Sequence, residues 1–328
     1  MIPSKLNKGD KIMVIAPSGS LSIVSERNRE IAVKKLEELG FKVELSNHSL
    51  ELDDFNSSAI ESRVSDINKA FKDDSVKGIL TAIGGFNVNQ ILKHLDYELI
   101  KDNPKILCGF SDITALSNAI YAKTNLATYS GPHFSTFGMV KGIDYTVEYF
   151  IRCLTKEDSF KVKPSKEWSD DFWFLNQKER TFIENNGMKI INKGEAEGTI
   201  IGGNLNTFNL LQGTEFMPKF NNSILFLEED YLLKDKFDVE FDRNLQSLIH
   251  LKNFNGVKAL VFGRFQKNAN VTTEKLKKII KVKRELESIP IIADVDFGHT
   301  TPIITFPIGG RARLLIKNSQ IGLEILEH

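Results

Sequence analysis

The sequence predicts an α/β protein in two parts, an N-terminal part built on a parallel sheet and a smaller C-terminal part of mixed α/β structure rich in β strands. Two patterns lead to this prediction. From residue 11 to residue 130, short apolar runs alternate with longer stretches whose apolar residues recur at helical spacing. From residue 194 onward only two helical stretches separate the apolar runs, and the last runs follow one another closely.

The N-terminal elements alternate strictly. Strands are predicted at 11–16, 41–45, 77–83, 105–109 and 126–130, and helices at 25–40, 60–71 and 88–94. Such βαβ alternation requires a parallel sheet with helices on both faces. Residues 1–160 are therefore expected to form a Rossmann- or flavodoxin-like domain.

A polar segment with several aromatic residues, 161–193, follows and is expected to be a linker or crossover. In the C-terminal domain, 194–328, strands are predicted at 197–201, 223–227, 257–262 and 289–293, helices at 237–251 and 272–286, and hairpins around 303–306 and 312–316.

Composition excludes several classes of protein. The 43 basic and 43 acidic residues balance, so neither a nucleic acid nor another polyanion is expected as a partner. No apolar run approaches the ~20 residues of a membrane span, and the first residues lack the apolar core of a signal peptide. Cys108 and Cys153 are too few for a disulfide framework and are expected to be buried thiols. We therefore expect a cytoplasmic protein without membrane contact.

The hexapeptide at 109–114, Gly-Phe-Ser-Asp-Ile-Thr, lies between a predicted strand and a predicted helix. A serine at such a corner is held out of the backbone path beside helix N-terminal amides, which is how nucleophilic serines are presented. Ile113 replaces the last glycine of the usual elbow pattern, so Ser111 is also compatible with a simple helix N-cap.

Two further strand ends carry the other groups of a serine hydrolase. The strand at 223–227 ends in the acidic cluster Glu228, Glu229 and Asp230, and the strand at 289–293 leads to His299. In an α/β layer, strand ends converge on one crevice. An imidazole there can take the serine proton while a carboxylate orients the ring. The pattern leaves open which of the three acids does so.

Five ordered motifs, Gly84-Gly85, 109–112, Gly-Gly-Asn-Leu at 202–205, Leu-Glu-Glu-Asp at 227–230 and Phe-Gly-His at 297–299, resemble the LD-carboxypeptidase family of serine peptidases. The microcin C self-immunity proteins are one branch of that family. The resemblance runs from residue 15 to residue 314 and implies the two-domain layout, with the site in the cleft between the domains. It also implies a homodimer and no cofactor or metal. Consistent with that, the sequence has no His-Glu-x-x-His or cysteine pair, and the loop at 16–20 lacks phosphate-binding spacing.

The resemblance also implies the role of each site residue. Ser111 corresponds to the nucleophile, His299 to the base and Glu228 to the carboxylate that orients it. The backbone amides of Gly85 and Asp112 correspond to the oxyanion hole. The expected reaction is amide hydrolysis by a serine-type carboxypeptidase.

Two substrate classes fit the family. LD-carboxypeptidases release a terminal D-alanine from murein tetrapeptides, whereas the self-immunity branch cleaves the amide between an aspartyl group and a modified nucleotide. The Gly-Gly-x-Asn-x-Asn pattern at 84–89, the stretch 167–171 and the lysine-bearing loop 230–236 resemble the second branch. We therefore expect a small peptide or aminoacyl-nucleotide substrate, contacted by Phe86, Asn87, Gly203, Asn204 and Trp173.

Two points stay open at this stage. The tryptophans at 168 and 173 can stack on a nucleobase or simply cover the linker. His133 follows a predicted strand near the expected cleft, where a structural role is favoured over one in the pocket. A binding protein with a degenerate site is the alternative from another functional class.

Overall fold

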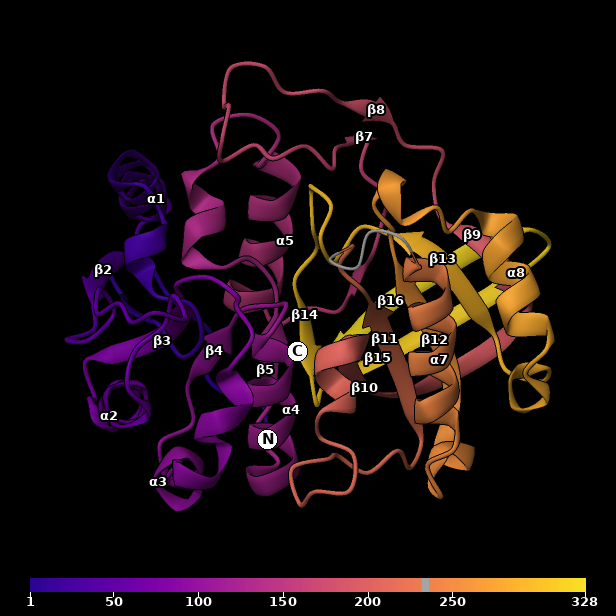
Figure 1. The fold of residues 1–328 in the computed structure, drawn as a ribbon, viewed down its shortest axis with the longest axis horizontal. Helices are drawn as coiled ribbons and strands as arrows, with labels where there is room; N and C mark the ends of the chain where they lie inside the picture. The colour runs from indigo at the N-terminus through magenta and orange to yellow at the C-terminus, as the bar shows by residue number, and fades with distance from the viewer. Residues whose placement is uncertain (232–235) are drawn as a thin grey trace.

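The computed structural model describes residues 1–231 and 236–328. Figure 1 shows two halves side by side, the N-terminal half from indigo to magenta and the C-terminal half from orange to yellow, each built on one large sheet. Four residues of the predicted loop 230–236, at 232–235, lie outside the described part of the chain. The mixed α/β fold, with parallel strands in the sheet of each half, confirms the predicted fold class.

The first sheet has the strand order β14-β5-β4-β3-β1-β2, in which all strands are parallel except β14. Its strands are β1 (Lys11–Ile15), β2 (Lys42–Leu45), β3 (Val76–Thr81), β4 (Ile106–Cys108), β5 (Thr128–Ser130) and β14 (Phe306–Ile308). The helices are α1 (Glu26–Glu38), α2 (Ile60–Lys72), α3 (Tyr97–Asp102), α4 (Ile113–Thr124) and α5 (Asp144–Thr155), with 3-10 turns η1 (Leu21–Ile23), η2 (Val88–His94) and η3 (Phe134–Gly138).

Helices cover both faces of this sheet because β1 is apolar on both sides. Ile12 and Val14 point into a core that contains residues of α1 and α5, whereas Met13 and Ile15 point into a core that contains residues of α2, α3 and α4. Successive side chains of a strand alternate between faces, so a fully apolar strand needs cover on each.

The second sheet has the order β6-β16-β15-β10-β11-β12-β13-β9, and its four strands from β10 to β13 are parallel. Its strands are β6 (Phe160–Lys161), β9 (Lys189–Asn192), β10 (Gly194–Asn204), β11 (Ser223–Glu228), β12 (Val257–Gly263), β13 (Ile291–Val295), β15 (Arg311–Lys317) and β16 (Gln320–Glu327). The helices are α6 (Leu205–Asn209), α7 (Phe237–Ile249) and α8 (Thr273–Lys281), with 3-10 turns η4 (Phe254–Gly256), η5 (Lys267–Ala269) and η6 (Arg284–Leu286). A short ribbon of β7 (Glu167–Trp168) and β8 (Ile183–Glu184) lies in the segment between the halves.

Three elements differ from the sequence prediction. The helix predicted at 272–286 ends at Lys281, and the expected linker 161–193 contains the strands β7, β8 and β9. The third difference concerns a strand of the first sheet. The apolar run expected to form a hairpin around 303–306 instead forms β14, which returns to the N-terminal half and pairs antiparallel with β5. Every residue of β14 is buried, so periodicity in the sequence gives no sign of which sheet it joins. The other predicted hairpin is formed by β15 and β16.

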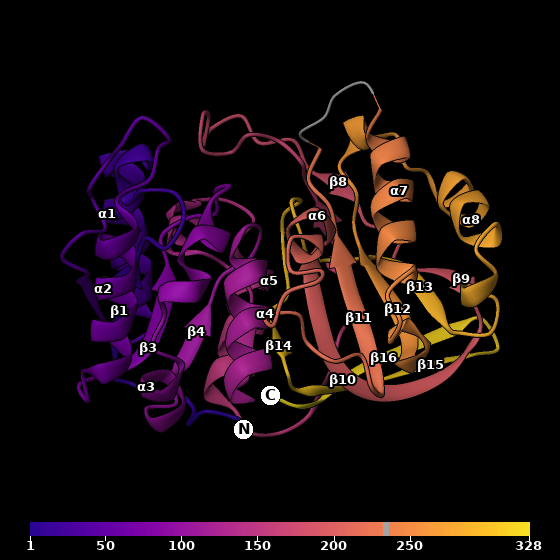
Figure 2. The same ribbon diagram turned by 60° about the horizontal axis from the view of Figure 1, so that its bottom comes forward.

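The two halves are joined by shared packing. Each of the two hydrophobic cores contains residues of both halves, and α4 packs against β10 and α6. Figure 2 shows both chain ends at this junction, where the Lys5 ammonium donates to the His328 carbonyl oxygen. Among the described residues, no helix is long and apolar enough to cross a membrane.

Candidate active site

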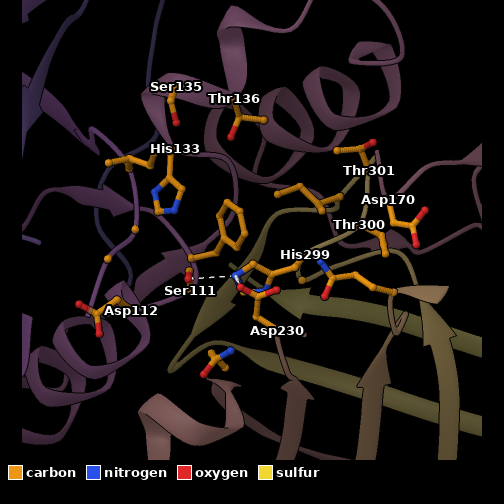
Figure 3. Close-up of a pocket in the computed structure, with 18 of the residues that line it drawn as sticks. Ser111, Asp112, His133, Ser135, Thr136, Asp170, Asp230, His299, Thr300 and Thr301 are labelled. Atoms are coloured by element: carbon orange, nitrogen blue, oxygen red, sulfur yellow. Dashed lines mark hydrogen bonds and ion pairs between the residues drawn. The ribbon is translucent and has the colours of Figure 1, made fainter. Parts of the chain in front are cut away.

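Strand ends from both halves meet at one cavity, which Figure 3 shows in close-up. Ser111 follows β4, Glu228 is the last residue of β11, and His299 follows β13. The Nε2 atom of His299 lies 3.0 Å from Ser111 Oγ, and its Nδ1 atom lies 2.7 Å from Glu228 Oε2. The structure thus brings together a hydroxyl, an imidazole and a carboxylate that are 71 and 188 residues apart in the chain.

Ser111 sits on a strained corner. Its φ of 59° is in the left-handed region, which costs a non-glycine residue free energy and is found where a site over-determines the backbone. The turn is tight, since a Cβ on Gly109 would lie 2.1 Å from Thr81 Oγ1. Helix α4 begins two residues after Ser111, so the hydroxyl stands beside its N-terminal amides.

Glu228 is buried against two glycines. A Cβ on Gly263 or on Gly298 would lie within 3.0 Å of the Glu228 side chain, so both positions must stay bare for the carboxylate to reach His299. Glu228 Oε1 is buried and has no hydrogen-bond partner among the described residues. Within the described part of the chain, the Glu228 carboxylate therefore hydrogen-bonds to the His299 imidazole alone.

Three acids surround the ring of His299. Burial opposes its charge, but the carboxylate of Glu228, followed by Asp230 and Glu229, raises the pKa of His299 to about 9. Asp230 Oδ2 lies 3.7 Å from His299 Nε2. Burial and the nearby Glu228 charge raise the pKa of Glu229 to about 8, although its Oε2 accepts a hydrogen bond from the Asn206 amide. The three acids therefore favour the protonated form of His299 at neutral pH, and the ring loses its proton at alkaline pH.

The amides of Gly85 and Asp112 are the predicted oxyanion hole. Neither amide donates a hydrogen bond to another of the described residues. Gly85 must be glycine, because a Cβ there would lie 2.2 Å from Ser18 Oγ. The Asp112 carboxylate accepts hydrogen bonds from Ser18 Oγ at 2.5 Å and from the Val88 amide at 2.9 Å. It thereby ties the serine corner to the loop that carries Gly85.

The cavity has a volume of about 660 Å³. Of the five expected substrate contacts, Phe86, Asn204 and Trp173 line it. Asn204 Oδ1 caps α6 by accepting from the Thr207 amide, which leaves the two hydrogens on its Nδ2 atom free to donate elsewhere.

Asn87 and Gly203 are not among the described residues that line the cavity. Asn87 Oδ1 accepts from the guanidinium of Arg63, behind the loop that carries Gly85. Gly203 packs against α4, where a Cβ would lie 2.4 Å from Thr114 Oγ1. Both residues pack within the backbone around the site, and their contact with substrate stays a prediction.

Sequence reasoning missed part of the cavity wall. The segment 169–174 contributes acidic and aromatic side chains, including Asp170, Asp171 and Phe172, and the expected linker thus covers the site. His133 also lines the cavity, although a structural role was favoured for it. Its position three residues after a parallel strand was the available signal. In the described part of the chain, no group of three or more His, Cys, Asp or Glu side chains has a geometry that would hold a metal ion.

Comparisons with known proteins find relatives that match this chain along its length. A putative carboxypeptidase of Bacillus subtilis (strain 168), YocD, is 56% identical over 315 residues, which cover 96% of each chain. The crystal structure of an MccF-like protein from Bacillus anthracis strain Ames superposes with a TM-score of 0.99 at 56% identity and covers all of both chains.

A more distant relative has a named role. The microcin C7 self-immunity protein MccF of Escherichia coli is 29% identical over 335 residues, covering 98% of this chain and 95% of its own. Its structure in complex with aspartyl sulfamoyl adenosine superposes with a TM-score of 0.89. The model of the LD-carboxypeptidase N-terminal domain matches residues 12–131, and that of the C-terminal domain matches residues 197–314. Matched along nearly its whole length, the chain belongs to the LD-carboxypeptidase family.

Proposed function

We propose that the protein is a metal-free serine amidohydrolase with Ser111 as nucleophile, His299 as base and Glu228 as the group that orients the base. The observation that carries the proposal is the continuous line of contacts from Ser111 Oγ through His299 to Glu228 Oε2, at a serine with positive φ. Family membership supports hydrolase chemistry of the carboxypeptidase type.

The geometry supports an acyl-transfer mechanism. Neutral His299 accepts the Ser111 proton on Nε2 as Oγ attacks the substrate carbonyl carbon, and Glu228 stabilises the imidazolium that forms. The amides of Gly85 and Asp112 donate to the oxyanion, which typically lowers the barrier by ~2.7 to 4 kcal/mol for each donor. His299 then protonates the leaving nitrogen, and water releases the acyl group by the same steps in reverse.

We propose an aminoacyl nucleotide, or a related small aminoacyl amide, as the substrate. MccF binds aspartyl sulfamoyl adenosine, and its fold is shared by this chain. The cavity is large enough for such a molecule, and Trp173 with its aromatic neighbours provides a surface on which a nucleobase can stack for ~1 to 3 kcal/mol. We propose that Nδ2 of Asn204, which lines the cavity, donates to a polar group of the aminoacyl part.

The competing substrate is a murein tetrapeptide, whose terminal carboxylate calls for a basic partner. The cavity wall in the described part of the chain contains aspartates and a glutamate but neither lysine nor arginine. An aspartyl substrate also carries a carboxylate, so the charge of this wall does not distinguish the two substrates. Direct comparison of the two reactions decides between them.

Two measurements test the proposal. A fluorophosphonate probe should label the wild-type serine and leave Ser111→Ala unlabelled, since only an activated hydroxyl reacts. Hydrolysis of aspartyl sulfamoyl adenosine should be compared with release of D-alanine from a murein tetrapeptide. A wild-type chain that resists the probe would instead fit the binding-protein alternative, and faster D-alanine release would favour the murein substrate.

We also propose that the enzyme is a cytoplasmic homodimer, as the family resemblance implies. Light scattering on the purified chain should give twice the monomer mass of 37.1 kDa. A monomeric mass at micromolar concentration would contradict the dimer, and recovery of the protein outside the cytoplasmic fraction would contradict the location.

A further inference from the structure

A second histidine, His133, borders the cavity next to Ser111. It follows β5 and precedes η3, and its side chain is almost completely buried, with 3% exposure. Its ring stacks on the ring of Phe110, with the two centroids 4.3 Å apart. The ring of Phe110 also contacts the ring of His299, at a centroid distance of 5.4 Å. Figure 3 shows the two histidines approaching Ser111 from different sides.

We assign the proton of His133 to Nδ1 from the hydrogen bonds around that atom. That atom lies 2.7 Å from Thr81 Oγ1, and the Thr81 hydroxyl donates to the carbonyl oxygen of Cys108 at 3.4 Å. Because a carbonyl only accepts, the single hydroxyl proton is used there, and Thr81 Oγ1 accepts from Nδ1. Nε2 then carries a lone pair, and among the described residues it has no partner. Burial, with the charge of His299, lowers the pKa of His133 to about 3, so the ring stays neutral.

Gly84 keeps the space between Nε2 and the nucleophile open. A Cβ on Gly84 would lie 3.0 Å from Ser111 Oγ and 3.5 Å from His133 Nε2. All three residues line the cavity. A substrate atom bonded to Ser111 Oγ would therefore bring its neighbours within reach of the unpartnered nitrogen.

The geometry of the tetrahedral intermediate limits which substrate group can lie next to Nε2 of His133. Its carbon bears Ser111 Oγ, the oxyanion at the Gly85 amide, the leaving nitrogen beside His299, and the α-carbon of the acyl residue. The first three substituents have partners in the proposed mechanism. The fourth substituent, the α-carbon, therefore lies on the side of His133. Because Nε2 of His133 has a lone pair, it favours a hydrogen-bond donor attached to that α-carbon.

We propose that His133 contacts the substrate, with Nε2 accepting a hydrogen bond from the α-nitrogen of the residue whose carbonyl Ser111 attacks. This inference rests on the proposed function and narrows its substrate class to acyl residues that bear an α-amino or α-amido N–H.

A pair of substrates tests the contact. One is aspartyl sulfamoyl adenosine and the other is its succinyl analogue, which lacks only the α-amino group. Wild-type kcat/KM should be ~10- to 100-fold higher for the aspartyl compound, the range expected for a hydrogen bond to a charged group. His133→Phe keeps the ring volume and the stacking on Phe110 but removes the acceptor, so this preference should fall at least tenfold.

Amide variants separate the contact from a structural role. Glutamine can place its terminal oxygen near the Nε2 position, whereas asparagine reaches only the Nδ1 position that faces Thr81. His133→Gln should therefore retain more of the preference than His133→Asn. Thr81→Val removes the hydroxyl that holds the ring of His133 and keeps the histidine itself. It provides a second test of the contact should the His133 variants unfold. His94→Gln, at an exposed histidine away from the cavity, is the matched control and should keep the wild-type preference.

Fluorophosphonate labelling separates failure of this inference from failure of the proposed function. A wild-type chain that neither reacts with the probe nor hydrolyses either compound would overturn the proposed function and this contact with it. Labelling without hydrolysis of either compound would overturn the aminoacyl-nucleotide class and the contact together. If the wild type is active and folded His133→Phe retains the full preference, or if His133→Asn equals His133→Gln, the contact alone is wrong.

Discussion

The replacement of Glu228 by glutamine probes how the carboxylate controls the base. The carboxylate has one oxygen on His299 Nδ1 and a second, Oε1, that is buried without a partner among the described residues. A glutamine must place its NH2 group at one of these two positions. At the Oε1 position the NH2 group would be a buried donor without an acceptor, which costs ~1 to 3 kcal/mol.

The other orientation removes that cost but inactivates the base. With NH2 facing Nδ1, the ring must accept there and carry its proton on Nε2, the atom that faces Ser111 Oγ at 3.0 Å. Such a tautomer cannot take the serine proton. The corresponding acid-to-amide change in a serine protease lowers turnover by ~10⁴, or about 5.5 kcal/mol in activation free energy, and we expect a loss of that order for Glu228→Gln.

Glu229→Gln is the matched control. Burial and Glu228 raise the pKa of Glu229 to about 8, so near pH 7 glutamine replaces a largely protonated carboxyl of similar shape. Its kcat should stay within a few-fold of wild type. The assay is steady-state hydrolysis of the preferred substrate by both variants, with thermal unfolding to confirm folding. A crippled Glu229→Gln beside a healthy Glu228→Gln would refute the assignment of the carboxylate.

Four further outcomes are expected. Folded Ser111→Ala should lose several orders of magnitude in kcat, measured by single-turnover hydrolysis, and wild-type activity would exclude the nucleophile. EDTA should leave the rate unchanged, since proton transfer runs between side chains alone; a loss restored by zinc would contradict this. A profile of kcat/KM against pH should rise on an alkaline limb above the ordinary 6.5 of histidine, because the acids raise the pKa of His299 to about 9 and only its neutral form accepts the proton; Asp230→Asn should move that limb to lower pH. Asp112→Ala, which releases the Val88 amide, should lower kcat by up to the ~10²- to 10³-fold of one lost oxyanion donor, and an unchanged kcat would show that the loop needs no such tie.

Local patterns made much of the fold predictable. The corner at Ser111 follows from a strand, a glycine and a helix start that lie within ten residues, and the βαβ alternation of the first half is equally local. The strand β14 was placed wrongly because its residues lie 176 to 180 positions from their partners in β5 and are buried on both faces. Non-local pairing of a fully buried strand leaves no periodic signal.

The orientation of side chains limited the site prediction in a similar way. All six residues of β11 are buried, so strand alternation does not tell which of Glu228 and Glu229 points toward His299. Asn87 is in a motif that suggested substrate contact, yet the buried guanidinium of Arg63 holds its side chain oxygen. Such choices depend on partners that fold against the motif from elsewhere in the chain.

The distance between the nucleophile and its base depends on direct bonds between the two halves of the molecule. Asn118, fully buried on α4, donates to the Gly202 carbonyl oxygen at 2.7 Å and accepts from the Gly202 amide at 3.2 Å, at the end of β10. Asn204 in turn lies beside Glu228 in the parallel register of β10 and β11. The helix that starts at the nucleophile is therefore bonded to the strand next to the one that ends at the carboxylate. Because the two hydrophobic cores also cross the junction, a hinge motion of one half against the other would break buried polar and apolar contacts together, and these contacts therefore oppose opening of the cleft.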